Sequence, residues 1–301
     1  MSRKKCFSLS EDDRSILHFL WRVKVASTSA LFLRFEDEFK WKPFAAYERL
    51  LLLKKKNCIE TRSDRSGTFR IWTLTTKGFE AIRHLLLPLK EEGFGSESVM
   101  HDLHVLAAHY GEWITKGLAP DVLFATEQEL RRIDDADLPM WAQPLQVHKP
   151  DGVWYFLETK EKMLYALEVE LSRKRQNEYK TLGAFYSEET SITSVLWIVQ
   201  SKGHAGSIMA AFESATSSYR NIHNFVLLDD FRKFGWASEI VFGPNAKMSI
   251  HNFLEKARHN QGTTTTQPAT NHGRVEQILN VNLKRFNSST SVSARNQKFR
   301  A

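Results

Sequence analysis

The stretch Met163-Leu164-Tyr165-Ala166-Leu167-Glu168-Val169-Glu170-Leu171 decides the fold of this 301-residue chain. It is apolar apart from two glutamates, and the segment 148–156 before it also has a strand-like pattern, so the sequence predicts two paired strands. Because side chains two residues apart point to the same face of a strand, Glu168 and Glu170 share one face and their apolar neighbours occupy the other. An acidic pair therefore interrupts an otherwise apolar strand.

Asp151 lies in the neighbouring predicted strand, where it can meet the two glutamates. Three carboxylates that converge at the end of a buried sheet repel one another strongly without a cation. An all-oxygen cluster of this kind suits Mg²⁺ or Mn²⁺, and such an ion can bind a scissile phosphate and lower the pKa of an attacking water. The alternative is that the acids face solvent and do no chemistry.

Helices and strands alternate around this pair. The periodicity predicts helices over 99–116, 173–187 and 205–218, a helical turn at 127–132, and strands at 122–124, 194–199 and 224–228. This alternation is typical of an α/β fold in which helices cover both faces of a sheet. We assign the domain to residues 93–258, because the segment 88–100 resembles a linker.

The first 92 residues follow another pattern. Ser10 with three acids after it marks the start of a helix, and Pro43 marks the start of the third helix. Two strand-like stretches, 58–62 and 69–74, then lie on either side of a turn. Three helices followed by a two-stranded ribbon are typical of a winged helix-turn-helix domain, which we assign to residues 1–92.

A winged helix places its third helix in the major groove of DNA and its ribbon against the backbone or the minor groove. We therefore expect the partner to be double-stranded DNA with a specific site. The residues expected at DNA are Lys42, Tyr47 and Arg49 of the third helix and Arg62, Arg65 and Arg70 of the ribbon. The alternative is a small helical domain that mediates protein contacts only.

Charge is divided unevenly along the chain, whose formal net charge is +7. Residues 1–92 hold 19 Lys and Arg against 12 Asp and Glu, residues 259–301 hold 6 against 1, and the segment between them holds 17 against 22. Basic ends suit a polyanion and an acidic centre suits a metal ion, although solvated faces also vary in charge. Because apolar residues are scarce after residue 259, we expect a disordered basic tail, in which 275–286 has the pattern of a short helix.

Composition also excludes some classes of protein. No run of about 18 apolar residues is present, so no membrane span is predicted. The basic N-terminus lacks the apolar core of a secretory signal, and Cys6 and Cys58 are too few for a disulfide framework or a structural zinc site. We expect a cytoplasmic protein.

Pro150-Asp151 followed by Glu168-x-Glu170 resembles the PD-(D/E)XK nuclease pattern. The resemblance implies a restriction-endonuclease-like mixed sheet flanked by helices. The lysine that ends the pattern is replaced by Glu170, so another group has to orient the attacking water. Lys180, in the next predicted helix, is our candidate for this displaced lysine.

Over about residues 10–230 the chain also resembles the replication-relaxation family, which includes the MOBC-type conjugative relaxases. The matching segments are the winged helix, His101-Asp102-Leu103, the acidic segment around Glu127 and Glu129, Pro150-Asp151-Gly152, Leu167-Glu168-Val169-Glu170, and Tyr179-Lys180 followed by Tyr186. These relaxases use a restriction-endonuclease-like acidic site to nick DNA at a transfer origin.

The resemblance implies a set of site residues. The implied metal ligands are Asp151, Glu168 and Glu170, the implied catalytic residues are these three with Lys180, and the accessory candidates are Glu127, Glu129, His101 and Tyr186. Tyr186 has two interpretations, a covalent nucleophile or an aromatic side chain that packs its helix onto the sheet. We favour packing, because the nuclease fold generally uses water.

Three functions remain open. The first is a metal-dependent DNA endonuclease, a relaxase that nicks one strand at a plasmid or mobile-element transfer origin, with accessory mobilisation proteins or a coupling ATPase as partners. The second is a non-catalytic DNA-binding regulator of plasmid replication or transfer. The third is a double-strand endonuclease or transposase subunit.

Overall fold

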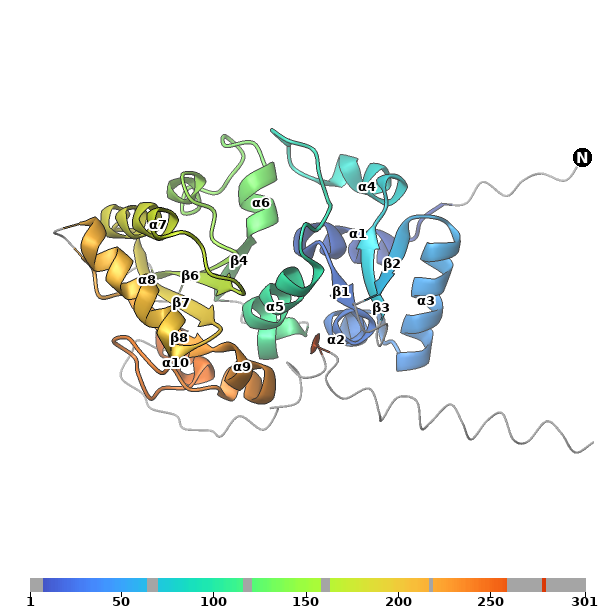
Figure 1. The fold of residues 1–301 in the computed structure, drawn as a ribbon. Helices are drawn as coiled ribbons and strands as arrows, with labels where there is room; N and C mark the ends of the chain where they lie inside the picture. The colour runs from blue at the N-terminus through green and yellow to red at the C-terminus, as the bar shows by residue number, and fades with distance from the viewer. Residues whose placement is uncertain are drawn as a thin grey trace, which may run out of the picture.

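The computed structural model describes residues 8–63, 70–115, 121–157, 163–216, 219–258 and 278–279. Figure 1 shows two parts, a smaller one built by the N-terminal residues and a larger one built around a five-stranded sheet. The chain is mixed α/β, with helices on both faces of the larger sheet, so the predicted fold class is confirmed at this level.

The smaller part contains four α-helices and a three-stranded sheet of order β1-β3-β2, in which all neighbours are antiparallel. Its elements are α1 (Glu11–Val23), β1 (Ala26–Ser27), α2 (Thr28–Phe39), α3 (Pro43–Lys55), β2 (Ile59–Ser63), β3 (Arg70–Leu74) and α4 (Thr76–Ile82). Helix α1 begins as predicted, because Ser10 and Asp13 form a reciprocal capping box. Pro43 is the first residue of α3, and the predicted turn around Arg65 lies outside the described residues.

The larger part is built on a sheet of order β4-β5-β6-β7-β8. Its strands are β4 (Val122–Thr126), β5 (Gly152–Phe156), β6 (Met163–Glu170), β7 (Ile192–Val199) and β8 (His223–Leu227). The first three strands run antiparallel to one another, whereas β6, β7 and β8 are parallel. The carboxyl ends of the parallel strands therefore lie at the same edge as the start of β5.

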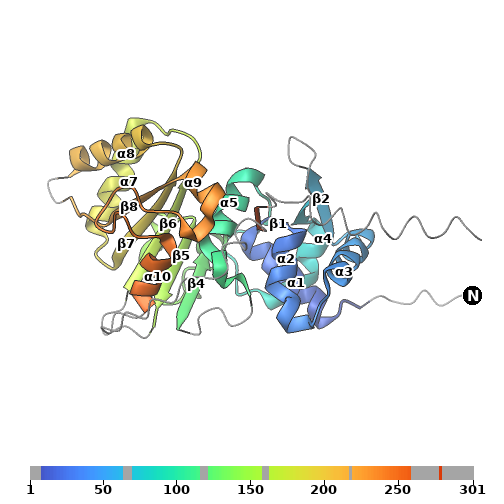
Figure 2. The same cartoon turned by 90° about the horizontal axis from the view of Figure 1, so that it is seen from below.

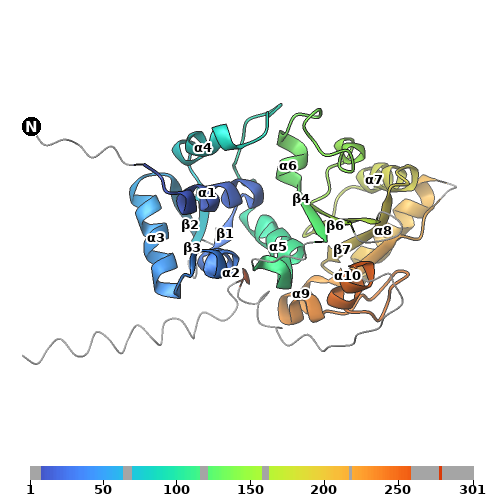
Figure 3. The same ribbon diagram turned by 180° about the vertical axis from the view of Figure 1, so that it is seen from behind.

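Helices cover the sheet on both faces. The helices of this part are α5 (Val99–Tyr110), α6 (Glu127–Arg132), α7 (Gln176–Glu188), α8 (Lys202–Ala215), α9 (Leu228–Phe234) and α10 (Ile250–Arg258). Helices α7 and α8 pack on the face that carries Ala166 and Trp197. Helices α5, α9 and α10 pack on the opposite face with Leu167 and Val169, as Figure 2 and Figure 3 show from two sides. No helix in the described ranges is long and apolar enough to cross a membrane.

Helix α5 ends earlier than the sequence predicts. Gly111 adopts a φ of +43°, a conformation that favours glycine, and the chain continues as a short 3₁₀ helix instead. A Cβ at Gly111 would lie 1.9 Å from the ring of Trp236. Close packing against this ring therefore decides where α5 stops.

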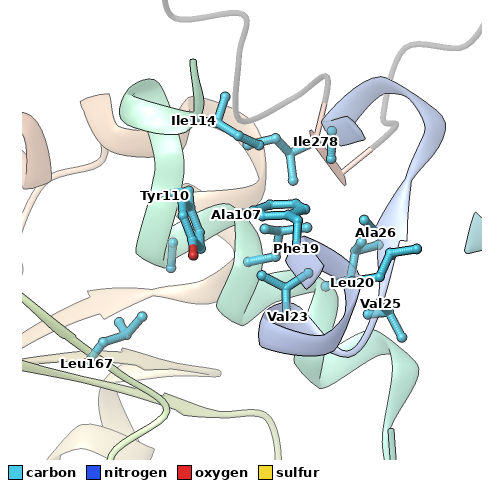
Figure 4. Packing of buried hydrophobic residues seen from close by; sticks show 14 of the residues in the cluster. Phe19, Leu20, Val23, Val25, Ala26, Ala107, Tyr110, Ile114, Leu167 and Ile278 are labelled. Carbon is cyan, nitrogen blue, oxygen red and sulfur yellow. The ribbon is translucent and has the colours of Figure 1, made fainter. Parts of the chain in front are cut away.

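The apolar interior runs without a break from the smaller part into the larger one. Figure 4 shows Phe19 and Val23 of α1 beside Ala107 and Tyr110 of α5. Ile278 belongs to the same cluster and is fully buried, and its carbonyl accepts a hydrogen bond from the Ser27 hydroxyl at 2.9 Å. Of the predicted tail 259–301, only residues 278–279 lie within the described chain, and these two are in the core.

Candidate functional site

Asp151 is tied directly to the acidic strand. It precedes β5, and its Oδ2 accepts a hydrogen bond of 2.7 Å from the backbone N–H of Val169. In the antiparallel register Gly152 pairs with Leu167, which puts Asp151 beside Glu168. The structure thus places the Asp151 carboxylate at the carboxyl end of β6, between the two predicted glutamates.

His101 of α5 approaches Asp151 from the opposite face of the sheet. Its Nε2 lies 3.4 Å from Asp151 Oδ2 and 3.0 Å from the Val169 carbonyl oxygen, and its Nδ1 lies 3.3 Å from Asp102. Burial lowers the pKa of His101, but the two carboxylates outweigh burial and raise the pKa to about 10. His101 is therefore an imidazolium at neutral pH, and it neutralises Asp151.

Glu168 is buried on the α7 face of the sheet, between two partners. His148 Nε2 lies 2.6 Å from its Oε1, and the Tyr186 hydroxyl donates a hydrogen bond to the same oxygen. Burial raises the pKa of Glu168, but His148, Tyr186 and Lys174 together hold it below its usual range. Glu168 is therefore ionised and fixed in orientation.

Tyr186 is completely buried. Burial and the nearby Glu168 carboxylate raise the pKa of its phenol well above the ordinary value. The hydroxyl thus remains protonated and positions Glu168. This is the packing and orienting arrangement rather than that of an exposed nucleophile.

Glu170 forms an ion pair with Lys174, whose Nζ lies 2.6 Å from its Oε2. Burial raises the pKa of Glu170; Lys174 opposes this shift, and the charges of Glu168 and Asp151 add to it. Lys180 is exposed on α7, and no ion pair joins it to an acid of the described chain. Lys174, and not Lys180, is the lysine that the structure brings to the acidic residues.

The three carboxylates share one electrostatic environment. Burial is the main cause that raises the pKa of Asp151, and the charge of Glu168 raises it further. Each acid has one cationic or potentially cationic neighbour: His101, His148 or Lys174. Among the described residues, no three His, Cys, Asp or Glu side chains form a group that could hold a metal ion.

The two acids of α6 face the smaller part of the molecule. Glu129 closes the capping box of α6 with Thr126 and binds Arg22 through both oxygens, at 2.9 and 3.0 Å. Glu127 forms an ion pair with Lys24, which also lies 3.5 Å from Asp102. These contacts join α6 to α1.

Glu127 nevertheless borders the site. It lines a cavity of about 20 Å³ together with Lys24, Asp102 and Asp151. This volume is enough for about one water molecule. Glu127 therefore shares this small cavity with Asp151, whereas Glu129 forms its ion pair with Arg22.

The residues predicted to contact DNA from α3 are arranged in different ways. Lys42 is exposed at the start of the helix. Arg49 forms an ion pair of 2.6 Å with the buried Asp13, so it belongs to the N-terminal cap of α1. The outward surface of α3 is apolar at Phe44, which is 66% exposed, and at Leu51, which is 39% exposed.

The described ribbon residues contact other parts of the chain. Arg70 lies over the Tyr47 ring, with its guanidinium carbon 5.5 Å from the ring centre. Arg62 donates to the Ser96 carbonyl at 3.4 Å and lies 3.6 Å from Glu60. Arg65 is outside the described residues.

Sequence reasoning missed His148 and Lys174. Lys174 follows Glu170 at the i,i+4 spacing, although the residues between them are not helical. His148 is the first residue of the segment 148–156 that the sequence predicts as a strand, whereas β5 begins only at Gly152. A titratable residue close to a predicted acidic site was the available signal in both cases.

Comparisons with protein-family models, with curated proteins and with solved structures found no match. Function is therefore inferred from the side chains of this site and from the fold that positions them.

Proposed function

We propose that the protein is a metal-dependent DNA endonuclease that nicks one strand at a transfer origin in the manner of a relaxase. The observation that carries the proposal is the hydrogen bond from Val169 N–H to Asp151, which holds three carboxylates at one edge of the sheet. The ammonium of Lys174 is at the same place. Two acids on paired strands with a lysine beside them are the chemistry that the PD-(D/E)XK resemblance implies.

The order of elements supports the same proposal. Along the chain come helix α5, strand β4, the short helix α6, strands β5 and β6, helix α7 and strand β7. The first three strands are antiparallel, and β7 is parallel to β6. We propose that this is the restriction-endonuclease-like core. We also propose that α1 to α3 and the β2–β3 ribbon form a winged helix, because the order of helices and strands agrees with that domain.

Asp151, Glu168 and Glu170 would hold the Mg²⁺ or Mn²⁺ ion, because carboxylate oxygens are the ligands these ions prefer. As they stand among the described residues they do not form a metal-binding group, so binding requires the carboxylates to turn from His101, His148 and Lys174 towards one point. The ion, when bound, polarises the phosphate and lowers the pKa of the attacking water. Lys174 is 44% exposed and holds a positive charge beside the acids, where it can contact a phosphate oxygen. His148 is 28% exposed and is held by Glu168 at the edge of the site, where its ring can contact a bound substrate.

Incubation of the purified protein with supercoiled plasmid and Mn²⁺ tests the proposal. We expect open circles from a plasmid that carries the cognate origin and intact DNA in EDTA. Glu168→Gln is expected to reduce cutting to the background without protein, while Glu188→Gln, on the exposed surface of α7, cuts as the wild type does. Cutting by the Glu168→Gln protein contradicts the assigned site, and a linear product favours a double-strand endonuclease.

A non-catalytic DNA-binding regulator is the second candidate. The contacts of the acids favour it, because His101 and Lys174 already balance Asp151 and Glu170, and His148 already contacts Glu168. The apolar outer surface of α3 further favours a helix that contacts a protein instead of DNA. Tight binding to the origin without any cutting in Mg²⁺ or Mn²⁺ would support this function.

A further inference from the structure

We propose that Arg173, Arg175 and Lys202 form a phosphate-binding rim that guides the DNA backbone to the acidic residues. The proposal rests on the endonuclease proposed above and names a part of the substrate that the site would hold. None of these cations belongs to the predicted DNA-contacting set. The partner is recognised by its phosphates, so the rim binds without regard to base sequence.

The topology brings the three cations to one edge of the sheet. Strands β6 and β7 are parallel and end at Glu170 and Val199, so the connections to α7 and α8 start side by side. The Gln200 amide donates a hydrogen bond to the Leu171 carbonyl and joins the two connections. A Cβ built at Gly203 would lie 3.7 Å from the Arg173 guanidinium, which puts Arg173 next to Lys202.

The rim is exposed, and its side chains form no ion pairs within the described ranges of the chain. Arg173, Arg175 and Lys202 are all exposed, and in the described parts of the chain none of them has an ion-pair partner. Lys174, between the two arginines, turns inward to Glu170. One short segment thus supplies both an inner ammonium at the acids and outer cations that face solvent.

A buried pair of side chains beneath the rim, Tyr179 and His204, is affected by the positive charge of this segment. The Tyr179 hydroxyl and His204 Nε2 are 2.7 Å apart, and both side chains are buried. Burial lowers the pKa of His204, and the charges of Arg173 and Lys174 lower it further. Arg173 of the rim and the inner Lys174 therefore act on the same buried pair.

The position of the rim beside the acidic residues explains why we propose phosphate, and not another anion, as its ligand. The domain around the sheet has an acidic excess, 22 Asp and Glu against 17 Lys and Arg, so an unpaired basic group beside its acidic site is unusual there. Guanidinium groups match phosphate oxygens in a two-pronged geometry. Cations next to carboxylates can hold a polyanion that the carboxylates alone would repel.

The test measures binding of a short origin duplex to the full chain in EDTA, where no cutting occurs, over a range of salt concentrations. The triple variant R173Q/R175Q/K202Q is expected to bind about tenfold more weakly, with a salt slope shallower by about 2 to 3. The matched control is K233Q/K247Q, which removes two exposed lysines from α9 and from the segment before α10. R173K/R175K keeps the charges and is expected to restore the wild-type slope.

An unchanged affinity and slope in the triple variant overturns the rim, as does an equal loss in the control. Because the assay needs no catalysis, the two proposals fail separately. If the triple variant shows the expected change in affinity and salt slope but the wild type never nicks plasmid, the rim proposal is supported and the endonuclease proposal is contradicted. Near-identical melting temperatures of wild type and triple variant ensure that folding does not cause the effect.

Discussion

Glu168 shows how one side chain is specified by its neighbours on three elements. His148 contacts Glu168 from the segment before β5, and the Tyr186 hydroxyl donates to it from α7. The positive charge of Lys174, in the loop between β6 and α7, also favours the ionised form of Glu168. A buried carboxylate without such partners would cost several kcal/mol of stability or take up a proton. The same contacts that stabilise Glu168 in the folded chain also keep its carboxylate ionised.

The Tyr186→Phe variant tests whether the Tyr186 hydroxyl only orients Glu168 or also acts as a nucleophile. The ring is retained, but the buried carboxylate of Glu168 loses one donor, so we expect the free energy of unfolding to fall by about 1.5 to 3 kcal/mol. Urea denaturation measures this change. Plasmid nicking is expected to persist in the folded variant, and its complete loss would instead indicate a covalent tyrosine.

The acids and two of their partners, His101 and Tyr186, were candidates from the sequence, whereas His148 and Lys174 were not. Alternation in β6 fixes the shared face of Glu168 and Glu170, since the strand period is a local property. The position of Lys174 depends on the loop that follows β6. Helix α7 starts at Gln176, later than predicted, and the non-helical residues before it place the Lys174 ammonium beside Glu170. Loop geometry of this kind has no periodic signal.

At the scale of elements, long and strongly patterned segments were predicted well. Strands β6 and β7 and helices α1, α3 and α7 are confirmed, with shifts at their ends. The two-residue strand β1 and the helices α9 and α10 were not predicted. Strand β1 exists because Ala26 pairs with Trp72, a contact between distant parts of the chain that local pattern does not encode.

The contact between α1 and α6 yields a second prediction. Arg22→Met leaves Glu129 without its cation in a setting where the two side chains are only 23% and 16% exposed. We expect a loss of about 2 kcal/mol in the free energy of unfolding, below the full cost of a broken buried pair because solvent screens part of it.

The double variant Arg22→Met/Glu129→Gln is the control. Glutamine retains the cap on Thr126 but has no charge, so we expect it to recover about half of the loss. Equal stability of the single and double variants would mean that the unpaired charge is not the cause.

At the scale of the whole molecule, buried histidines determine how the free energy of unfolding changes as the pH falls. Burial is the largest cause that lowers the pKa of His104 and His109 to about 4 and that of His223 to about 3. His104 accepts from Arg232 and His223 accepts from the Trp197 indole, contacts that require neutral rings. The unfolded chain binds protons near pH 6.5, where these folded rings do not.

We therefore expect stability to decline as the pH falls from 6.5 towards about 4, because the unfolded state takes up more protons in this range. Urea midpoints at several pH values measure the slope. His223→Gln is expected to flatten it, while His84→Gln, an exposed position, leaves it unchanged. A midpoint that is constant over this range would contradict the prediction.

The burial of Ile278 has a consequence for how the protein is made. Its carbonyl meets Ser27, a residue translated 251 positions earlier. Helices α1 and α2 leave the ribosome first. The apolar contact surface between these helices and α5, here called the seam, lacks the Ile278 side chain until translation has passed residue 278. During synthesis this seam is a hydrophobic surface open to chaperones, and closing it is a late step of large loop entropy.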